Sequence, residues 1–155
     1  MKRLKLLFCM MVLAFALTAC SKGGKDITVD VAKLAEELQA QTVTSDTLSA
    51  TAPEMLPSIY FVEADQVANG AAYMSSGSTS CEVAVIECKE AKQAEEVTKS
   101  FQTRVANQSD LFASYDPEEV TKLDAAIIKT SGKYAVLCVC DDTKKAEEIL
   151  KNYGF

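Results

Sequence analysis

The fold is decided by one stretch of the chain, Ala71-Ala72-Tyr73-Met74-Ser75-Ser76-Gly77-Ser78-Thr79-Ser80-Cys81-Glu82-Val83-Ala84-Val85-Ile86-Glu87-Cys88. Residues 71–76 and 82–88 are rich in the apolar and β-branched side chains that favour strands. Small polar residues at 77–80 join the two runs and are typical of a turn. The stretch therefore predicts an antiparallel hairpin.

A second hairpin is predicted further along the chain. Strand-like runs at 125–130 and 133–140 flank Ser131-Gly132, a two-residue turn signal. The two hairpins together predict four antiparallel strands.

A long amphipathic helix is predicted between the hairpins, over residues 90–113. Polar residues such as Glu96 and Arg104 fall on the side facing water, and we expect Phe101 to press on the sheet through residues such as Val85 and Val136. Five apolar residues recur on the other side at helical spacing: Ala94, Val97, Phe101, Val105 and Phe112.

Shorter helices are predicted on either side of this core. Asp30 is placed to cap a helix over 31–40, and Asp116-Pro117 begins a brief one. Asp141-Asp142 caps a last helix that Gly154 ends. The Ser- and Thr-rich residues 42–51 read as a loop with one short extended piece, followed by a helical turn near 56–60, and a further turn is expected after Asp65.

These elements follow one another in the order α-β-β-α-β-β-α. This order predicts an α+β fold, a two-layer sandwich in which helices pack on a four-stranded antiparallel sheet made from the two hairpins. With 155 residues, one domain is expected.

Charge and composition exclude several classes of function. The chain has 16 Lys and Arg, 22 Asp and Glu, and a net charge of −6. Such an acidic chain lacks the basic surface that nucleic acid requires. It contains no histidine, so His-dependent catalysis and zinc sites of the usual His type are excluded.

The first twenty residues have the pattern of an export signal. Lys2, Arg3 and Lys5 precede an apolar run at 6–17, which is too short to span a bilayer comfortably. The run ends in Leu17-Thr18-Ala19-Cys20, which resembles the bacterial lipobox. We expect residues 1–19 to be a lipoprotein signal peptide, Cys20 to carry the lipid, residues 20–29 to form a tether, and residues 30–155 to form the single α+β domain.

Several local strings resemble a known family. They are Met55 to Tyr60, Ala71 to Ile86, the amphipathic helix and Ser131-Gly132-Lys133-Tyr134. Over about residues 29–153 the chain resembles the domain-of-unknown-function family 4358 (DUF4358), small lipoproteins or membrane-anchored proteins mostly of Gram-positive anaerobes. The resemblance implies no particular activity and no catalytic residues.

Four cysteines follow the lipobox, and they allow three interpretations. Cys81, Cys88, Cys138 and Cys140 lack the spacing of zinc sites or redox motifs. They could be buried free thiols, Cys88 could form one disulfide with Cys138 or Cys140, or the thiols could support redox or metal chemistry.

Other polar clusters have a structural explanation. Asp141-Asp142, Glu95-Glu96, and Asp116 with Glu118-Glu119 could be paired carboxylates, although each also suits a helix cap, a first helical turn or a solvated face. The Ser-rich turn at 75–80 lacks the lysine and the strand-to-helix setting of a phosphate loop. One or two exposed tyrosines could form a stacking platform for a ligand.

We therefore expect a lipid-anchored extracytoplasmic protein on the outer face of the cell membrane. Its expected function is to bind an unknown envelope protein or small ligand, without catalysis, cofactor, metal or nucleic acid. The alternative is an envelope thiol redox protein or enzyme that uses Cys138, Cys140 or Cys88.

Overall fold

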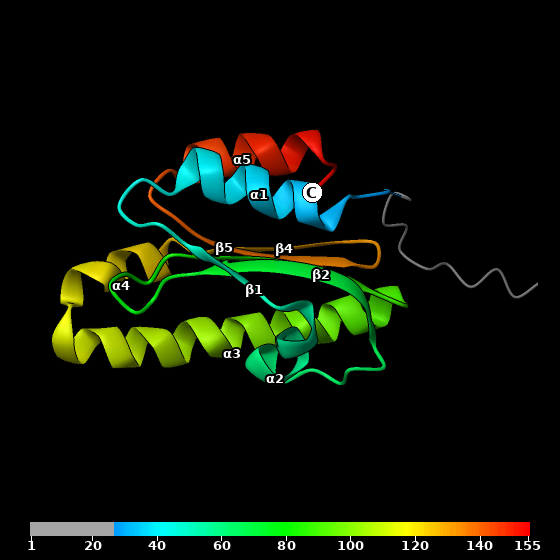
Figure 1. Ribbon diagram of the computed structural model, residues 1–155, viewed down its shortest axis with the longest axis horizontal. Coiled ribbons are helices and arrows are strands. Elements are labelled where there is room, and N and C mark those ends of the chain that lie inside the picture. The colour runs from blue at the N-terminus through cyan, green and yellow to red at the C-terminus, as the bar shows by residue number, and fades with distance from the viewer. Residues whose placement is uncertain (1–26) are drawn as a thin grey trace, which may run out of the picture.

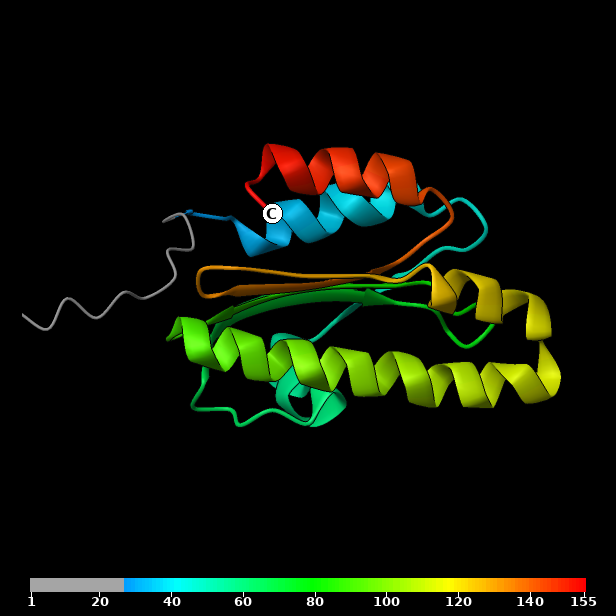
Figure 2. The ribbon, with the colours of Figure 1, turned by 180° about the vertical axis from the view of Figure 1, so that it is seen from behind.

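A computed structural model describes residues 27–155 and has three layers, with one antiparallel sheet in the middle (Figure 1). Two helices, α1 and α5, lie side by side on one face of the sheet, and α2 and α3 cover the other face. Seen from behind, α3 runs along most of the length of the sheet (Figure 2). The α+β class is confirmed, whereas the predicted two-layer sandwich is wrong, because helices cover both faces.

The sheet has five strands in the order β1-β2-β3-β5-β4. Both predicted hairpins form, and β3 pairs with β5 to join them. The predicted four-stranded sheet lacked β1, which adds to the edge of β2 from within the Ser- and Thr-rich loop. The strands are β1 (Ser49–Thr51), β2 (Val67–Met74), β3 (Glu82–Cys88), β4 (Ile127–Ser131) and β5 (Tyr134–Val139).

Two of the predicted helix caps form as expected. The side chains of Asp30 and Asp142 accept hydrogen bonds from the backbone N–H of Lys33 and Lys145, respectively, at the starts of α1 and α5. The helices are α1 (Val31–Thr42), the short 3-10 helix η1 (Pro53–Met55), α2 (Leu56–Tyr60), α3 (Ala91–Tyr115), α4 (Pro117–Asp124) and α5 (Thr143–Asn152).

The sheet separates two hydrophobic cores. Odd-numbered residues of β3, such as Val83 and Val85, face α1 and α5, whereas Ala84 and Ile86 face α2 and α3. Phe101 of α3 therefore packs in the same core as Ala84 and Ile86. Our expectation that it presses on Val85 and Val136 is wrong. Those two residues face the opposite core, because side chains that are adjacent along a strand point to opposite faces of the sheet.

Two local predictions are also corrected. Val67 and Ala68 begin β2, so the helical turn expected after Asp65 does not extend into them. Ser131 pairs with Tyr134, and the turn of the second hairpin is therefore Gly132-Lys133 rather than Ser131-Gly132. Gly132 has a φ of 54°, a conformation that glycine adopts without strain.

Residues 1–19, assigned to the signal peptide, and Cys20 lie outside the described residues. Ile27 and Val29, the first apolar residues described, pack on the core beneath α1 and α5. Among the described helices, none combines the length and the hydropathy needed to cross a membrane.

Candidate binding groove

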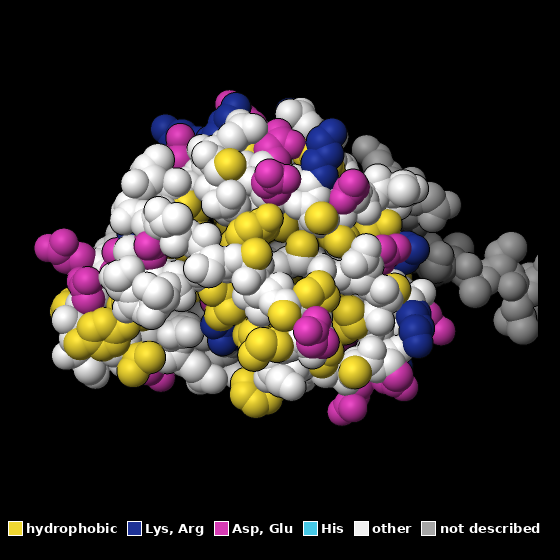
Figure 3. Space-filling view, in the orientation of Figure 1, with side chains coloured by type: hydrophobic (Ala, Val, Ile, Leu, Met, Phe, Trp, Pro, Cys, Tyr) yellow, Lys and Arg dark blue, Asp and Glu magenta, His cyan; other side chains and the backbone are white. Residues whose placement is uncertain are grey.

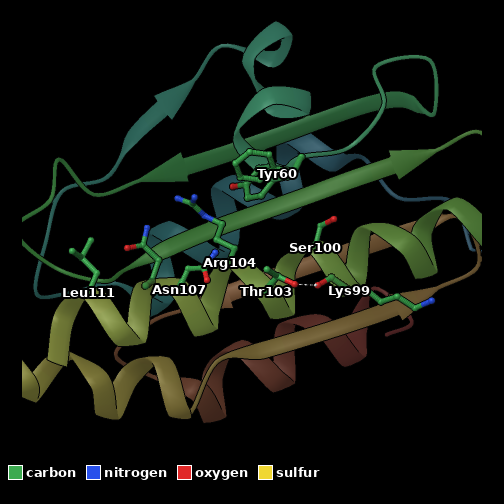
Figure 4. A pocket seen from close by; sticks show the side chains of 9 residues that line it. Tyr60, Lys99, Ser100, Thr103, Arg104, Asn107 and Leu111 are labelled. Carbon is green, nitrogen blue, oxygen red and sulfur yellow. Dashed lines mark hydrogen bonds between the residues drawn. The ribbon is translucent and has the colours of Figure 1, made fainter.

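A hollow of about 580 Å³ lies between α3 and the end of α2 (Figure 4). One face of α3 forms most of its wall, because the lining residues of that helix recur at intervals of one turn. The residues that line it are Tyr60, Phe61, Lys99, Ser100, Thr103, Arg104, Asn107, Gln108 and Leu111.

A smaller hollow of about 210 Å³ continues along α3 toward the turn between β2 and β3. The two hollows share Arg104, Gln108 and Leu111, so they form one depression, which we call the α3 groove. Glu82 and Tyr115 line the smaller hollow.

Arg104 is held in the groove by a buried carboxylate. Its Nε lies 2.8 Å from both carboxylate oxygens of Glu82. The hydroxyl of Tyr60 donates a hydrogen bond of 2.7 Å to the same carboxylate. The Cζ atom of Arg104 lies 5.5 Å from the centre of the Tyr60 ring, within cation–π distance. These contacts fix both the position and the plane of the guanidinium group.

Strand geometry explains how Glu82 reaches this position. It is the first residue of β3, and its even number places it on the face of the sheet that α3 covers. Its side chain is only 7% exposed, and that of Arg104 is 18% exposed. A carboxylate so deeply buried requires a charged partner, which Arg104 supplies.

The surroundings fix the charge states of the two partners of Glu82. Burial opposes the charge of Arg104, yet the hydrogen bond and charge of Glu82 raise its pKa above the ordinary value. Burial and the charge of Glu82 raise the pKa of Tyr60 well above its usual range. Arg104 is therefore a cation and Tyr60 a neutral hydrogen-bond donor.

The rim of the groove is apolar and uncovered. Large apolar side chains are exposed at four positions in residues 27–155, and three of them, Phe61, Leu111 and Tyr115, line the groove. The fourth, Met55, ends the 3-10 helix before α2. In Figure 3, yellow side chains gather over α2 and near the end of α3, with a white hollow between them. Such clustering is typical of an interaction site.

Phe61 owes its exposure to the way α2 ends. It follows the last residue of α2 and has a φ of 54°, in the left-handed region where glycine is preferred. This residue ends the helix, and its ring is 87% exposed at the rim.

The model of the family described as "Domain of unknown function (DUF4358)" matches residues 33–140. The chain belongs to this family. No curated protein and no solved structure matches it. The DUF4358 region runs from α1 through Cys140, the residue after β5, and includes every residue that lines the α3 groove.

A second polar cluster lies at one end of the sheet, around Lys122 of α4. Lys122 Nζ lies 2.8 Å from Glu119 and 3.0 Å from Asp141, and it donates a hydrogen bond of 2.9 Å to Ser45 Oγ. Asp141 also accepts hydrogen bonds from the backbone N–H groups of Thr44 (2.6 Å) and Ser45 (2.8 Å). The cluster therefore ties α4 and the end of β5 to the loop after α1.

The charged side chains of this cluster form ion pairs with one another. Burial opposes ionisation of Asp141, but the N–H groups of Thr44 and Ser45 and the ammonium of Lys122 lower its pKa well below its usual range. Although burial opposes its charge, hydrogen bonds to Glu119 and Asp141 raise the pKa of Lys122. The two carboxylates considered as a pair at Asp141-Asp142 therefore have separate roles: Asp141 pairs with Lys122, and Asp142 caps α5. We interpret the cluster as structural.

The Ser-rich turn of the first hairpin is hydrogen-bonded to two carboxylates from elsewhere in the DUF4358 region. The hydroxyls of Ser75, Ser78 and Thr79 all donate hydrogen bonds to Asp46 Oδ2. The next residue of the turn, Ser80, donates from its N–H and its hydroxyl to Glu119, each at 2.8 Å. The turn therefore surrounds two carboxylates of its own chain.

All four thiols of the described region are free and buried. Cys88 lies at the opposite end of β3 from the partner of Cys138, and its side chain is in the core beneath α3, whereas Cys138 and Cys140 belong to the other core. The structure therefore excludes the disulfide considered between Cys88 and Cys138 or Cys140. Within residues 27–155, no cluster of acidic or thiol side chains is arranged to hold a metal ion.

Cys138 of β5 and Cys140, just after the strand, lie in the same hydrophobic core and interact. A hydrogen bond from the Cys138 thiol lowers the pKa of Cys140, against the effect of burial, and the hydroxyl of Thr42 and the N–H of Asp142 act in the same direction. The same pairing, together with burial, raises the pKa of Cys138. Of these two thiols, Cys140 is therefore the one that ionises first.

Proposed function

We propose that this DUF4358 protein is a lipid-anchored extracytoplasmic binding module and that the α3 groove is its binding site. The observation that supports this proposal is the groove itself, with an apolar rim open to water and a guanidinium group held in a fixed position. The basic and apolar start of the sequence, ending in Leu17-Thr18-Ala19-Cys20, supports export and anchoring through a lipid on Cys20.

The side chains that line the larger hollow suit binding better than catalysis. They are hydrogen-bond donors and acceptors such as Ser100, Thr103 and Asn107, the two cations Lys99 and Arg104, and apolar groups. Proton transfer near neutral pH is favoured by a group whose pKa lies close to 7, and the ordinary values of arginine, lysine, amides and hydroxyls lie far from it. We therefore propose recognition without chemical conversion.

Photo-crosslinking in the producing cell tests this proposal. A photoreactive phenylalanine analogue replaces Thr103, which is exposed in the groove, or Lys144, which is exposed on α5 across the sheet. We expect light-dependent adducts in the membrane fraction from position 103 and none from position 144. Equal adducts at the two positions, or none at position 103, would contradict the proposal.

A thiol function is the second candidate, and the lowered pKa of Cys140 is the observation that favours it. A thiolate stabilised by a neighbouring thiol is a nucleophile. Cys140 is only 2% exposed, however, which restricts access by a substrate and places this candidate second. The rate of iodoacetamide reaction against pH tests it, since a functional Cys140 should react in the native protein with an inflection below pH 9.

A further inference from the structure

We infer that the α3 groove binds an amphipathic monoanion, a small molecule that carries one carboxylate on an apolar body. This inference rests on the proposed function, because it names the class of ligand for the same groove. Three features of the groove carry it: the free edge of Arg104, the balance of charges, and the apolar surfaces beside them.

The first feature is the orientation of Arg104. Glu82 occupies its Nε, and within residues 27–155 no hydrogen bond is made by its two terminal nitrogen atoms. Figure 4 shows the side chain extending from α3 toward Tyr60 along the wall of the hollow. The two terminal nitrogens form a planar, paired set of donors that matches the two oxygens of a carboxylate.

The second feature is the charge balance. Lys99 and Arg104 are the charged residues among those that line the larger hollow. This local excess of positive charge contrasts with the acidic chain around it, whose net charge is −6. Glu82 neutralises one of the two cations, so a single positive charge is left for the ligand. That balance favours a monoanion over a dianion such as a phosphate monoester.

The third feature is the apolar surface next to the cation. The buried ring of Tyr60 forms part of the wall, and the exposed side chains of Phe61 and Leu111 also line the hollow. A volume of about 580 Å³ is in the usual range of roughly 300–1,000 Å³ for ligand sites, which are mostly apolar with a few fixed polar groups. A free carboxylic acid with an apolar body has this chemistry.

A matched pair of probes tests the inference on the full chain held in phosphatidylcholine nanodiscs. The probes are 3-phenylpropionate and its uncharged amide, 3-phenylpropanamide, and binding is followed by saturation-transfer NMR with empty nanodiscs as the blank. We expect the acid to bind at least ~10-fold more tightly than the amide, equivalent to ~1.4 kcal/mol.

Three variants assign the binding to the groove. Arg104→Gln should reduce acid binding ~10-fold or more and leave amide binding unchanged, whereas Lys92→Gln, which removes an exposed charge from the first turn of α3, should change neither. Because Arg104→Gln leaves Glu82 buried without its partner and could unfold the domain, Ser100→Trp provides a second approach. It fills the hollow while keeping both members of the Arg104–Glu82 pair in the sequence, and it should abolish binding of both probes.

The outcomes separate the two proposals. If the acid and the amide bind equally and both are lost in Ser100→Trp, the groove binds ligands but the anion inference is wrong. If the acid binds equally well to the native chain and to folded Arg104→Gln, the inference is also overturned. If neither probe binds while position 103 still crosslinks in cells, the proposed function stands and the ligand class is wrong. The absence of both signals overturns both proposals.

Discussion

Replacement of Phe101 by alanine should destabilise the domain by about 4 kcal/mol. The Phe101 side chain has no exposed surface, and its ring meets that of Tyr60 edge to face, with centroids 5.0 Å apart and planes at 81°. Removal of a buried phenylalanine side chain typically costs ~3–5 kcal/mol, and an aromatic pair contributes ~0.5–1.5 kcal/mol beyond its buried area. The pairing with Tyr60 argues against the lower end of this range, and about 4 kcal/mol is its midpoint.

Urea denaturation of a soluble form that begins at Ser21 measures this cost. With a urea m-value near ~2 kcal/mol per M, a loss of ~4 kcal/mol lowers the unfolding midpoint by ~2 M. Glu96→Ala is the control, because Glu96 is exposed on the other side of α3 and accepts only one long hydrogen bond, 3.4 Å from Gln66; its effect should stay within ~0.5 kcal/mol.

The opposite ranking would refute the assignment of the helix faces. If Phe101→Ala costs less than ~1 kcal/mol while Glu96→Ala is severe, α3 presents a different side to the sheet. The groove built on the same helix would then be misplaced too, because its residues occupy the positions adjacent to the buried stripe.

Three further predictions concern the charged cluster, the buried thiols and the anchor. Asp141→Asn should destabilise the domain above pH 4. Since the folded state lowers the pKa of Asp141 from 3.8, the difference in urea midpoint between variant and native protein should shrink as the pH falls below that value. Urea denaturation curves at pH 7, 5 and 3 measure this difference. Burial raises the pKa of Cys88 to about 11, so iodoacetamide at pH 8 should leave it unmodified in the native protein and alkylate it in urea, as mass spectrometry of peptides would show. Cys20→Ala should abolish acylation and leave an uncleaved or mislocalised precursor; an unmodified Cys20 in the membrane fraction of cells with the native gene would contradict the anchor.

Much of the fold could be predicted from patterns that depend on neighbouring residues. The stripe that contains Val97 and Phe101 defines α3, and the caps at Asp30 and Asp142 define two helix starts. The error in the number of layers had a visible signal: β3 and β5 are apolar without alternation over 83–86 and 135–139, as expected of strands buried on both faces. The short extended piece expected within residues 42–51 forms as β1, but its pairing with β2 gave no such signal, because its three residues are small or polar.

The candidate groove could not be predicted, because its decisive contact joins residues far apart in the sequence. We placed Arg104 on the side of the long helix that faces water, but its side chain is largely buried against Glu82, 22 residues earlier. Helical periodicity assigns a charged residue to the surface and does not indicate a partner on a neighbouring strand. An acid at the first position of an apolar strand, as Glu82 is, was the available clue.

The left-handed backbone at Phe61 puts stability in competition with function. A non-glycine residue with this φ costs of order 1 kcal/mol, and the exposed ring gains nothing from burial within the domain. Glycine at this position would relieve the strain and remove an apolar surface from water. The most stable version of this domain is therefore not the one that presents an aromatic ring at the groove, and selection for folding alone would not be expected to retain Phe61.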